Sequence, residues 1–97
     1  MPGPGIWVAV YRSIRSPEKL AAYAALAGPA IESGGGTFIA RGMPAVVYEA
    51  GVMARTVVIR FASVEAAIAT HDSEAYKKAL DALGDGAERE IRILEGV

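Results

Sequence analysis

The stretch Arg-Thr-Val-Val-Ile-Arg-Phe at residues 55–61 decides the fold, because it is the clearest β-strand in the sequence. β-branched and aromatic side chains dominate this stretch, and they favour an extended backbone. Ser63 follows and can cap a helix, with Glu65 in the first turn at the positive end of the helix dipole. The sequence therefore predicts a strand that passes directly into a helix.

Similar signals mark further elements on both sides of this unit. Upstream lie the predicted strand Ile6–Arg12, a helix between the Ser16 cap and the glycines at 34–36, the strand Thr37–Arg41, and a short strand or hairpin arm at Ala45–Glu49. Downstream lie a further helical stretch from Glu74 to about Leu83 and the strand Glu90–Leu94. The order β-α-β-β-α-β defines the ferredoxin-like arrangement, an antiparallel sheet with two helices on one face. We expect residues 1–97 to form one α+β domain of this kind.

The composition argues against several classes of function. The 97 residues carry 10 basic and 11 acidic side chains, and no run of bases marks a nucleic-acid surface. No segment reaches the ~18 consecutive apolar residues of a membrane span. With no cysteine and one histidine, the sequence shows no metal-ligand cluster, and we expect no cofactor. The lack of cysteine and of an export signal favours the cytoplasm.

One face of the predicted sheet has no helix to cover it. Ile6, Val8 and Val10 share one face of the first strand, and the opposite face of that strand is also apolar. A monomer would therefore expose an apolar patch beside charged residues, and such patches usually mark an interface. We expect a homodimer in which the sheet of an identical subunit covers the open face.

A series of short motifs runs along nearly the whole chain, each weak alone but fairly specific in order and spacing. They are Ile6–Val10, Pro17-Glu18 with Tyr23, Pro29, Gly34-Gly35 with Phe38, Arg41-Gly42, Glu49 with Gly51, Arg55 to Ser63, Glu65-Ala66-Ala67, Asp72-Ser73 with Tyr76, and Glu95-Gly96-Val97. In these motifs the chain resembles the dimeric α/β-barrel superfamily. More narrowly, it is similar to a family of short bacterial proteins of unknown function within that superfamily.

The resemblance implies two sheets packed face to face, with the helices outside and a cavity in each subunit. Other members of the superfamily are small monooxygenases, isomerases and dehalogenating enzymes, many of which work without a cofactor. The chain departs from the family pattern at Thr70-His71, where an aromatic pair is usual, at Ser73-Glu74-Ala75, and at Leu83, where an arginine is common. The helix-side wall of any pocket has therefore changed, and a substrate common to the family need not be the substrate of this chain.

Three side chains are candidates for acid, base or anion-stabilising roles in such a cavity: Tyr23, Arg41 and His71. Tyr23 could donate its hydroxyl to a ligand carbonyl or could equally pack its ring in the core. Arg41 alternates with apolar strand residues and could clamp a carboxylate or enolate, or form a structural ion pair. His71 could act as a general acid or base, but without an identifiable partner a simple helix-end position is favoured.

The sequence leaves three hypotheses of function. The first is a cofactor-independent enzyme, monooxygenase- or isomerase-like, that acts on a small, partly apolar molecule in the cavity of each subunit. The second is a protein that binds a small ligand without chemistry, and the third is a structural homodimer whose cavity is filled by its own side chains. We place the enzyme slightly ahead of the binding protein by analogy with the superfamily, although fold alone does not establish function.

Overall fold

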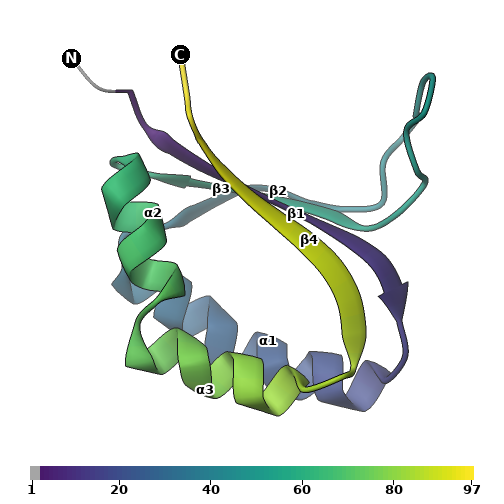
Figure 1. The fold of residues 1–97 in the computed structure, drawn as a ribbon, viewed down its shortest axis with the longest axis horizontal. Helices are drawn as coiled ribbons and strands as arrows, with labels where there is room; N and C mark the ends of the chain where they lie inside the picture. Colours follow the sequence, from purple (N-terminus) through teal and green to yellow (C-terminus); the bar gives the residue numbers. More distant parts are fainter. Residues whose placement is uncertain (1–2) are drawn as a thin grey trace.

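The computed structural model describes residues 3–97, so Met1 and Pro2 of the predicted domain lie outside the described part. The elements in chain order are β1 (Gly5–Ile14), α1 (Pro17–Ser33), β2 (Thr37–Gly42), β3 (Thr56–Phe61), α2 (Val64–His71), α3 (Glu74–Leu83) and β4 (Ala87–Glu95). Figure 1 shows the three helices on one side of a single sheet, with the other side of the sheet open. The predicted α+β ferredoxin-like fold is confirmed.

The sheet has the strand order β2-β3-β1-β4, and all neighbouring strands are antiparallel. β1 is therefore central, and its Trp7 lies between Ile59 of β3 and Ile93 of β4. Because β1 and β4 are far apart in the sequence, their pairing closes the domain and places residues near both ends of the chain side by side. The register shifts between Tyr11 and Ser13, which marks a bulge near the end of β1.

The core lies between the sheet and the helices. Side chains alternate across a strand, so Trp7, Ala9 and Tyr11 all point from β1 towards the helices, and all three are buried. The ring of Trp7 stacks on Phe61 at 5.9 Å between centroids and meets the edge of another ring, Tyr76 of α3, at 5.2 Å. The more apolar face of the sheet therefore packs on the helices, and the mixed face is the open one.

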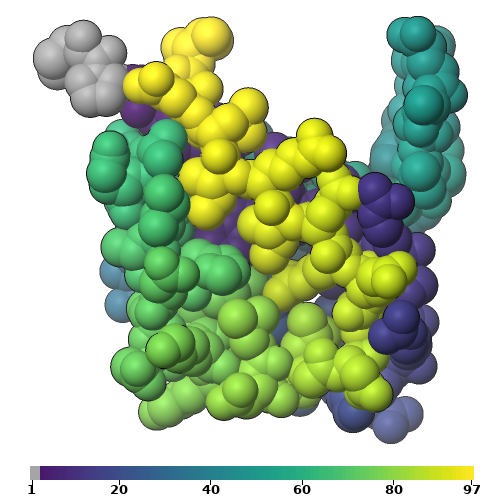
Figure 2. Space-filling model, viewed as in Figure 1, coloured from purple at the N-terminus to yellow at the C-terminus, as the bar shows by residue number. Residues whose placement is uncertain are grey.

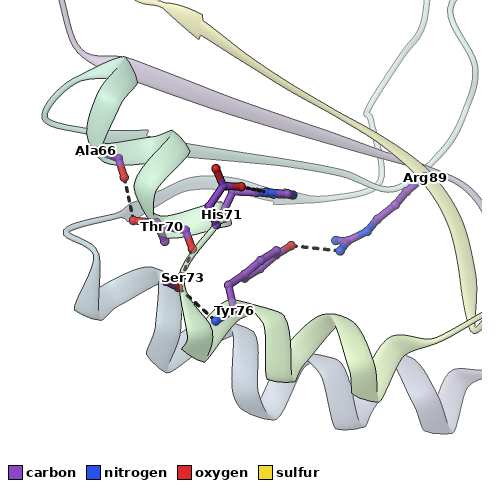
Figure 3. Close-up of polar contacts among 7 residues, drawn as sticks. Ala66, Thr70, His71, Ser73, Tyr76 and Arg89 are labelled. Carbon is purple, nitrogen blue, oxygen red and sulfur yellow. Dashed lines mark hydrogen bonds and ion pairs between the residues drawn. The ribbon is translucent and has the colours of Figure 1, made fainter.

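The second helical region divides into α2 and α3, which are separated by Asp72 and Ser73. The Ser73 hydroxyl donates to the carbonyl oxygen of Thr70 at 2.7 Å and accepts from the amide of Tyr76 at 3.2 Å. The Thr70 hydroxyl in turn donates to the carbonyl oxygen of Ala66 at 2.8 Å, as Figure 3 shows. These bonds fix the junction of the two helices, and with it the start of α3 and the position of Tyr76.

The expected short strand or hairpin arm at Ala45–Glu49 does not form a strand. Residues 43–55, here called the arm, leave the sheet as a loop that turns where the amide of Gly51 donates to the carbonyl oxygen of Tyr48 at 2.9 Å. Figure 2 shows the arm standing away from the body, so it has no neighbouring strand with which to pair. The valines and the tyrosine of this stretch favour an extended backbone, but a strand also needs a neighbouring strand with which to pair.

Candidate functional site

A cavity of about 360 Å³ lies between the sheet and α1. Its walls are mostly apolar: Trp7 and Ala9 come from β1, Val57 and Ile59 from β3, and Ala27 and Ile31 from α1. Tyr11, Tyr23, Arg41, Arg55 and Arg89 supply the polar side chains of its lining. A concave, largely apolar site with a few convergent polar groups is the usual form of a small-molecule pocket.

Arg89 is the centre of a cluster of hydrogen bonds with three tyrosines, which we call the Arg89–tyrosine cluster. Its Nη1 donates to the hydroxyl oxygens of Tyr11 at 3.1 Å and Tyr23 at 2.9 Å, and its Nη2 donates to that of Tyr76 at 3.0 Å. The Tyr23 and Tyr76 hydroxyls also bond to one another at 2.7 Å. β1, α1, α3 and β4 therefore meet at one guanidinium, and Figure 3 shows its bond to Tyr76.

Local structure explains why these residues converge. Tyr11 and Arg89 are register partners across β1 and β4, so both side chains point from the sheet to its helix-covered face. Tyr23 lies on the buried side of α1, whose first turn is fixed by the Ser16 side chain accepting from the amide of Lys19. The guanidinium also lies over the Tyr23 ring, with Cζ 4.4 Å from the ring centroid, which is a cation–π distance.

Burial raises the pKa of two tyrosines of the cluster, Tyr11 and Tyr23. The pKa of Tyr23 is raised well above its ordinary value of 10.0, chiefly by burial and then by the neighbouring Tyr76, and Arg89 lowers it only in part. Burial also raises the pKa of Tyr11, and Arg89 again opposes the shift. Burial alone would lower the pKa of Arg89, but the surrounding tyrosine oxygens raise it by more, so its charge is retained. The cluster thus holds Tyr11 and Tyr23 as neutral phenols on a fixed cation.

The other polar side chains of the cavity are also cationic. Arg41 pairs in register with Val57, which directs it to the helix-covered face, and its guanidinium carbon lies 4.7 Å from the centroid of the Phe38 ring. Arg55 precedes β3 and is half-buried. Within residues 3–97, neither of these arginines nor Arg89 forms a salt bridge, and no aspartate or glutamate lines the cavity. The cavity therefore carries an uncompensated positive charge.

The described residues show no metal centre and no membrane helix. No group of three or more His, Cys, Asp or Glu side chains within residues 3–97 could hold a metal ion. None of the helices in that part of the chain has the length and apolar character needed to cross a bilayer.

The sequence profile described as "Domain of unknown function (DUF1330)" matches residues 4–97. The chain belongs to the DUF1330 family. No curated protein matches it in sequence. The membership agrees with the resemblance to short proteins of unknown function, and it leaves the activity of this DUF1330 chain unassigned.

Three solved structures show the same fold. The RPA0582 protein of unknown function from Rhodopseudomonas palustris has a TM-score of 0.74 at 18% identity, covering 100% of this chain and 85% of that one. SnoaB from Streptomyces nogalater, described as a cofactor-independent oxygenase, has a TM-score of 0.66 at 12% identity, covering 98% and 94%. A dimeric ferredoxin-like protein of unknown function from Thermobifida fusca has a TM-score of 0.63 at 19% identity, covering 96% and 92%.

The structure brings two of the three sequence candidates to one site. Tyr23 and Arg41 both line the cavity, whereas His71 is not among its lining residues. The His71 Nδ1 lies 3.0 Å from a carboxylate oxygen of Asp72, and its ring packs 5.3 Å from that of Tyr76. Figure 3 shows His71 beside the ring of Tyr76 and Arg89 at the Tyr76 hydroxyl. His71 instead lies in a shallow depression between α2 and β4.

Sequence reasoning missed the centre of the site. The last strand was expected to begin at Glu90, but β4 begins at Ala87, so Arg89 belongs to the sheet. Tyr76 is fully buried, as a core residue should be, yet its hydroxyl belongs to the cluster. Arg89, Ile91 and Ile93 occupy every second position and therefore share one face of the strand. An arginine on this apolar face is the sequence signal that could have revealed the site.

Proposed function

We propose that the cavity is the active site of a cofactor-independent enzyme acting on a small, partly apolar molecule. The observation that carries this proposal is the Arg89–tyrosine cluster, a fixed cation whose Tyr11 and Tyr23 side chains line a largely apolar cavity. Donors held in place in a water-poor site stabilise negative charge that develops on a substrate oxygen. This arrangement supports reactions that pass through an enolate or a related oxyanion.

Two reaction types use such an intermediate without a cofactor. In an isomerisation, a proton leaves a carbon beside a carbonyl group, the oxygen takes the charge, and a proton returns at another carbon. In an oxygenation, a methylene activated in the same way reacts with dioxygen to give a ketone and one water, which balances the four electrons removed. We assign Tyr23 and Arg41 to direct contact with the substrate oxygen. Arg89 would support Tyr23 through their hydrogen bond, and His71 would serve only in packing. The description of SnoaB as a cofactor-independent oxygenase supports the second type.

We also propose that the active form is a homodimer, with the open face of the sheet covered by a second copy. Ile6, Val8 and Val10 form a half-buried apolar stripe along the middle of that face. The arm rises on the same side of the sheet, away from the helices, and exposes further apolar side chains at its tip, with Tyr48 at 77% exposure. A second sheet laid on the stripe would lie beside the arm, and the dimeric description of the Thermobifida fusca protein supports this arrangement.

A binding protein without chemistry is the second candidate, and a specific observation favours it. The side chains lining the cavity include no carboxylate and no imidazole within residues 3–97, and Tyr23 holds its proton at neutral pH. The cavity therefore has donors for an oxyanion but no evident general base. Chemistry here would need a substrate acidic enough to lose its proton to water.

Carbon-bound hydrogen exchange separates these two functions. Ketones and diketones that carry an aromatic ring (phenylacetone, β-tetralone, benzoylacetone) would be incubated with the protein in D₂O. NMR would follow the loss of their C–H signals, and dioxygen uptake would be measured in parallel. An enzyme should accelerate exchange or dioxygen uptake, and Tyr23→Phe or Arg41→Gln should lower the rate by about tenfold to a thousandfold.

His71→Ala is the matched control, because it removes a titratable side chain outside the cavity and should leave that rate unchanged. Binding is read independently from the fluorescence of Trp7, which is the only tryptophan and lines the cavity. Binding of these probes with no acceleration by the wild-type protein would favour the binding protein over the enzyme.

A further inference from the structure

We infer that the cavity takes its ligand as an anion, an organic acid or an enol or phenol already ionised at neutral pH, attached to an apolar body. This inference rests on the proposed function only in using the same cavity, and it names the class of ligand. The polar side chains of the lining are Arg41, Arg55, Arg89 and two tyrosines, and all three arginines lack an acidic partner within the described residues.

Arg89 retains unused donors. A guanidinium has five N–H groups in a planar fork. Three of them go to the oxygens of Tyr11, Tyr23 and Tyr76, and the described residues offer no acceptor to the remaining donors on Nη2 and Nε. Because a half-buried cation is costly when its donors are left without acceptors, the cavity favours a ligand that supplies one.

The tyrosine hydroxyls also carry hydrogen atoms that lack an acceptor within the described residues. Their oxygens already accept from Arg89, and one of the three hydroxyl hydrogens is used between Tyr23 and Tyr76. The hydroxyl hydrogen of Tyr11 has no acceptor within residues 3–97, and neither has one of the hydrogens of the Tyr23–Tyr76 pair. Every polar side chain of the lining is thus ready to donate. A carboxylate only accepts, whereas the NH₂ of a neutral amide would face further donors.

The walls define the rest of the ligand. Ile31, Val57 and Ile59 offer branched chains with no polar atom that would need a partner, so the body of the ligand is apolar. The cavity lies near the lower end of the ~300–1,000 Å³ range of small-molecule pockets, which suits a body of one or two rings. The geometry points to arylalkanoate-like acids and ionised enols of similar size.

The test compares acids with their neutral amides. Phenylacetate, 3-phenylpropanoate and cyclohexanecarboxylate would each be titrated into the wild-type protein beside the corresponding amide, with Trp7 fluorescence and calorimetry as readouts. Hydrogen bonds to charged groups are worth about 1.5–3 kcal/mol, so at least one acid should bind on the order of tenfold to a hundredfold more tightly than its amide. Added salt should weaken binding of the acid and leave binding of the amide unchanged.

Arg41→Gln and Arg55→Gln, both outside the Arg89–tyrosine cluster, should each weaken binding of the acid several-fold with no effect on the amide. They keep the test independent of whether an Arg89 variant folds. Leu26→Gln is the matched control, since Leu26 is exposed on α1 and does not line the cavity. Equal affinity of acid and amide in every pair, or no binding of any acid at millimolar concentration, would overturn the inference. Equal affinity would leave the proposed enzyme standing, because turnover of a neutral ketone does not require an anionic ligand.

Discussion

The Nη1 of Arg89 lies 2.9 Å from the hydroxyl oxygen of Tyr23, and the same guanidinium lies over the Tyr23 ring. The last strand of the sheet therefore holds the first helix through a charged hydrogen bond and a cation–π contact at once. Since Tyr11 and Tyr76 bind the same group, the cluster both joins four elements and faces the cavity. A substitution in the cluster should therefore change both the free energy of unfolding and the affinity for ligand.

Tyr23→Phe should lower both stability and ligand binding. The change removes the hydroxyl that accepts from Arg89 and bonds to Tyr76, and we expect the free energy of unfolding to fall by about 1–2 kcal/mol. Urea unfolding measures this loss, and the arylalkanoate titration measures the weaker binding. Tyr76→Phe is the matched control, because it also loses two hydrogen bonds of the cluster but does not line the cavity. Equal effects of both variants on binding would contradict a direct contact of Tyr23 with the ligand.

Stability should fall as the pH rises above about 10. The folded protein raises the pKa of Tyr11 and Tyr23 above their ordinary value of 10.0, so these phenols stay protonated while those of the unfolded chain ionise. Proton loss then favours the unfolded state. The stabilisation is fully present below the tyrosine pKa of the unfolded chain, and it is lost as the pH rises towards the tyrosine pKa of the folded protein. Urea unfolding between about pH 9 and about pH 11 measures the slope, and Tyr23→Phe should reduce it. The same slope in that variant would contradict a role for Tyr23.

Self-association should depend on the open face and on the arm. Tyr48→Ser should raise the dissociation constant of the dimer by about tenfold or more, since buried aromatic side chains dominate interfaces, and Val8→Lys should do so by placing a charge in the apolar stripe. Sedimentation velocity over a range of protein concentrations measures both effects. Leu26→Ser removes an apolar side chain that is 44% exposed on the helix side, and it should leave the dimer intact. A wild-type protein that stays monomeric at high concentration would refute the dimer outright.

Gly36→Ala should destabilise the domain at the point where α1 turns into β2. A Cβ added there would lie 2.6 Å from Cγ2 of Ile31 and 2.8 Å from Cζ of Phe61, so the core must shift, at a cost of about 1–3 kcal/mol. Thermal and urea unfolding measure the change. Gly28→Ala is the matched control within α1, because an added Cβ meets nothing within 4 Å and alanine favours a helix. A melting temperature that fell equally in both variants would show that the crowding around Phe61 is not the cause.

The sequence allowed the fold to be predicted because the decisive signals are local. The caps at Ser16, Ser63 and Ser73 start the three helices, and the alternation in β3 identifies its buried face without knowledge of its neighbours. The failure at Ala45–Glu49 has a physical cause: a strand needs a partner, and residue preference alone does not supply one.

The site was harder to predict because it is made by pairing over long distances in the sequence. Tyr23 and Arg41 could be found from their own patterns, but Arg89 reaches Tyr23 only through the register of β1 with β4, in which it meets Tyr11. A lone histidine attracts attention because histidine is the side chain that most commonly exchanges protons near neutral pH, yet His71 packs against the ring of Tyr76 and does not line the cavity. Chemical rarity in a sequence is thus a weaker guide than placement on a buried strand face.

The arm joins the two proposed properties of the protein. Both of its ends carry or adjoin cavity arginines: Arg41 is the penultimate residue of β2, two residues before the arm, and Arg55 is the last residue of the arm, immediately before β3. A second subunit that held the arm would also hold these two cations in place, so that occupancy of the cavity and association of subunits become thermodynamically linked. Linkage is reciprocal, and ligand affinity should then rise with protein concentration by the same factor by which the ligand tightens the dimer.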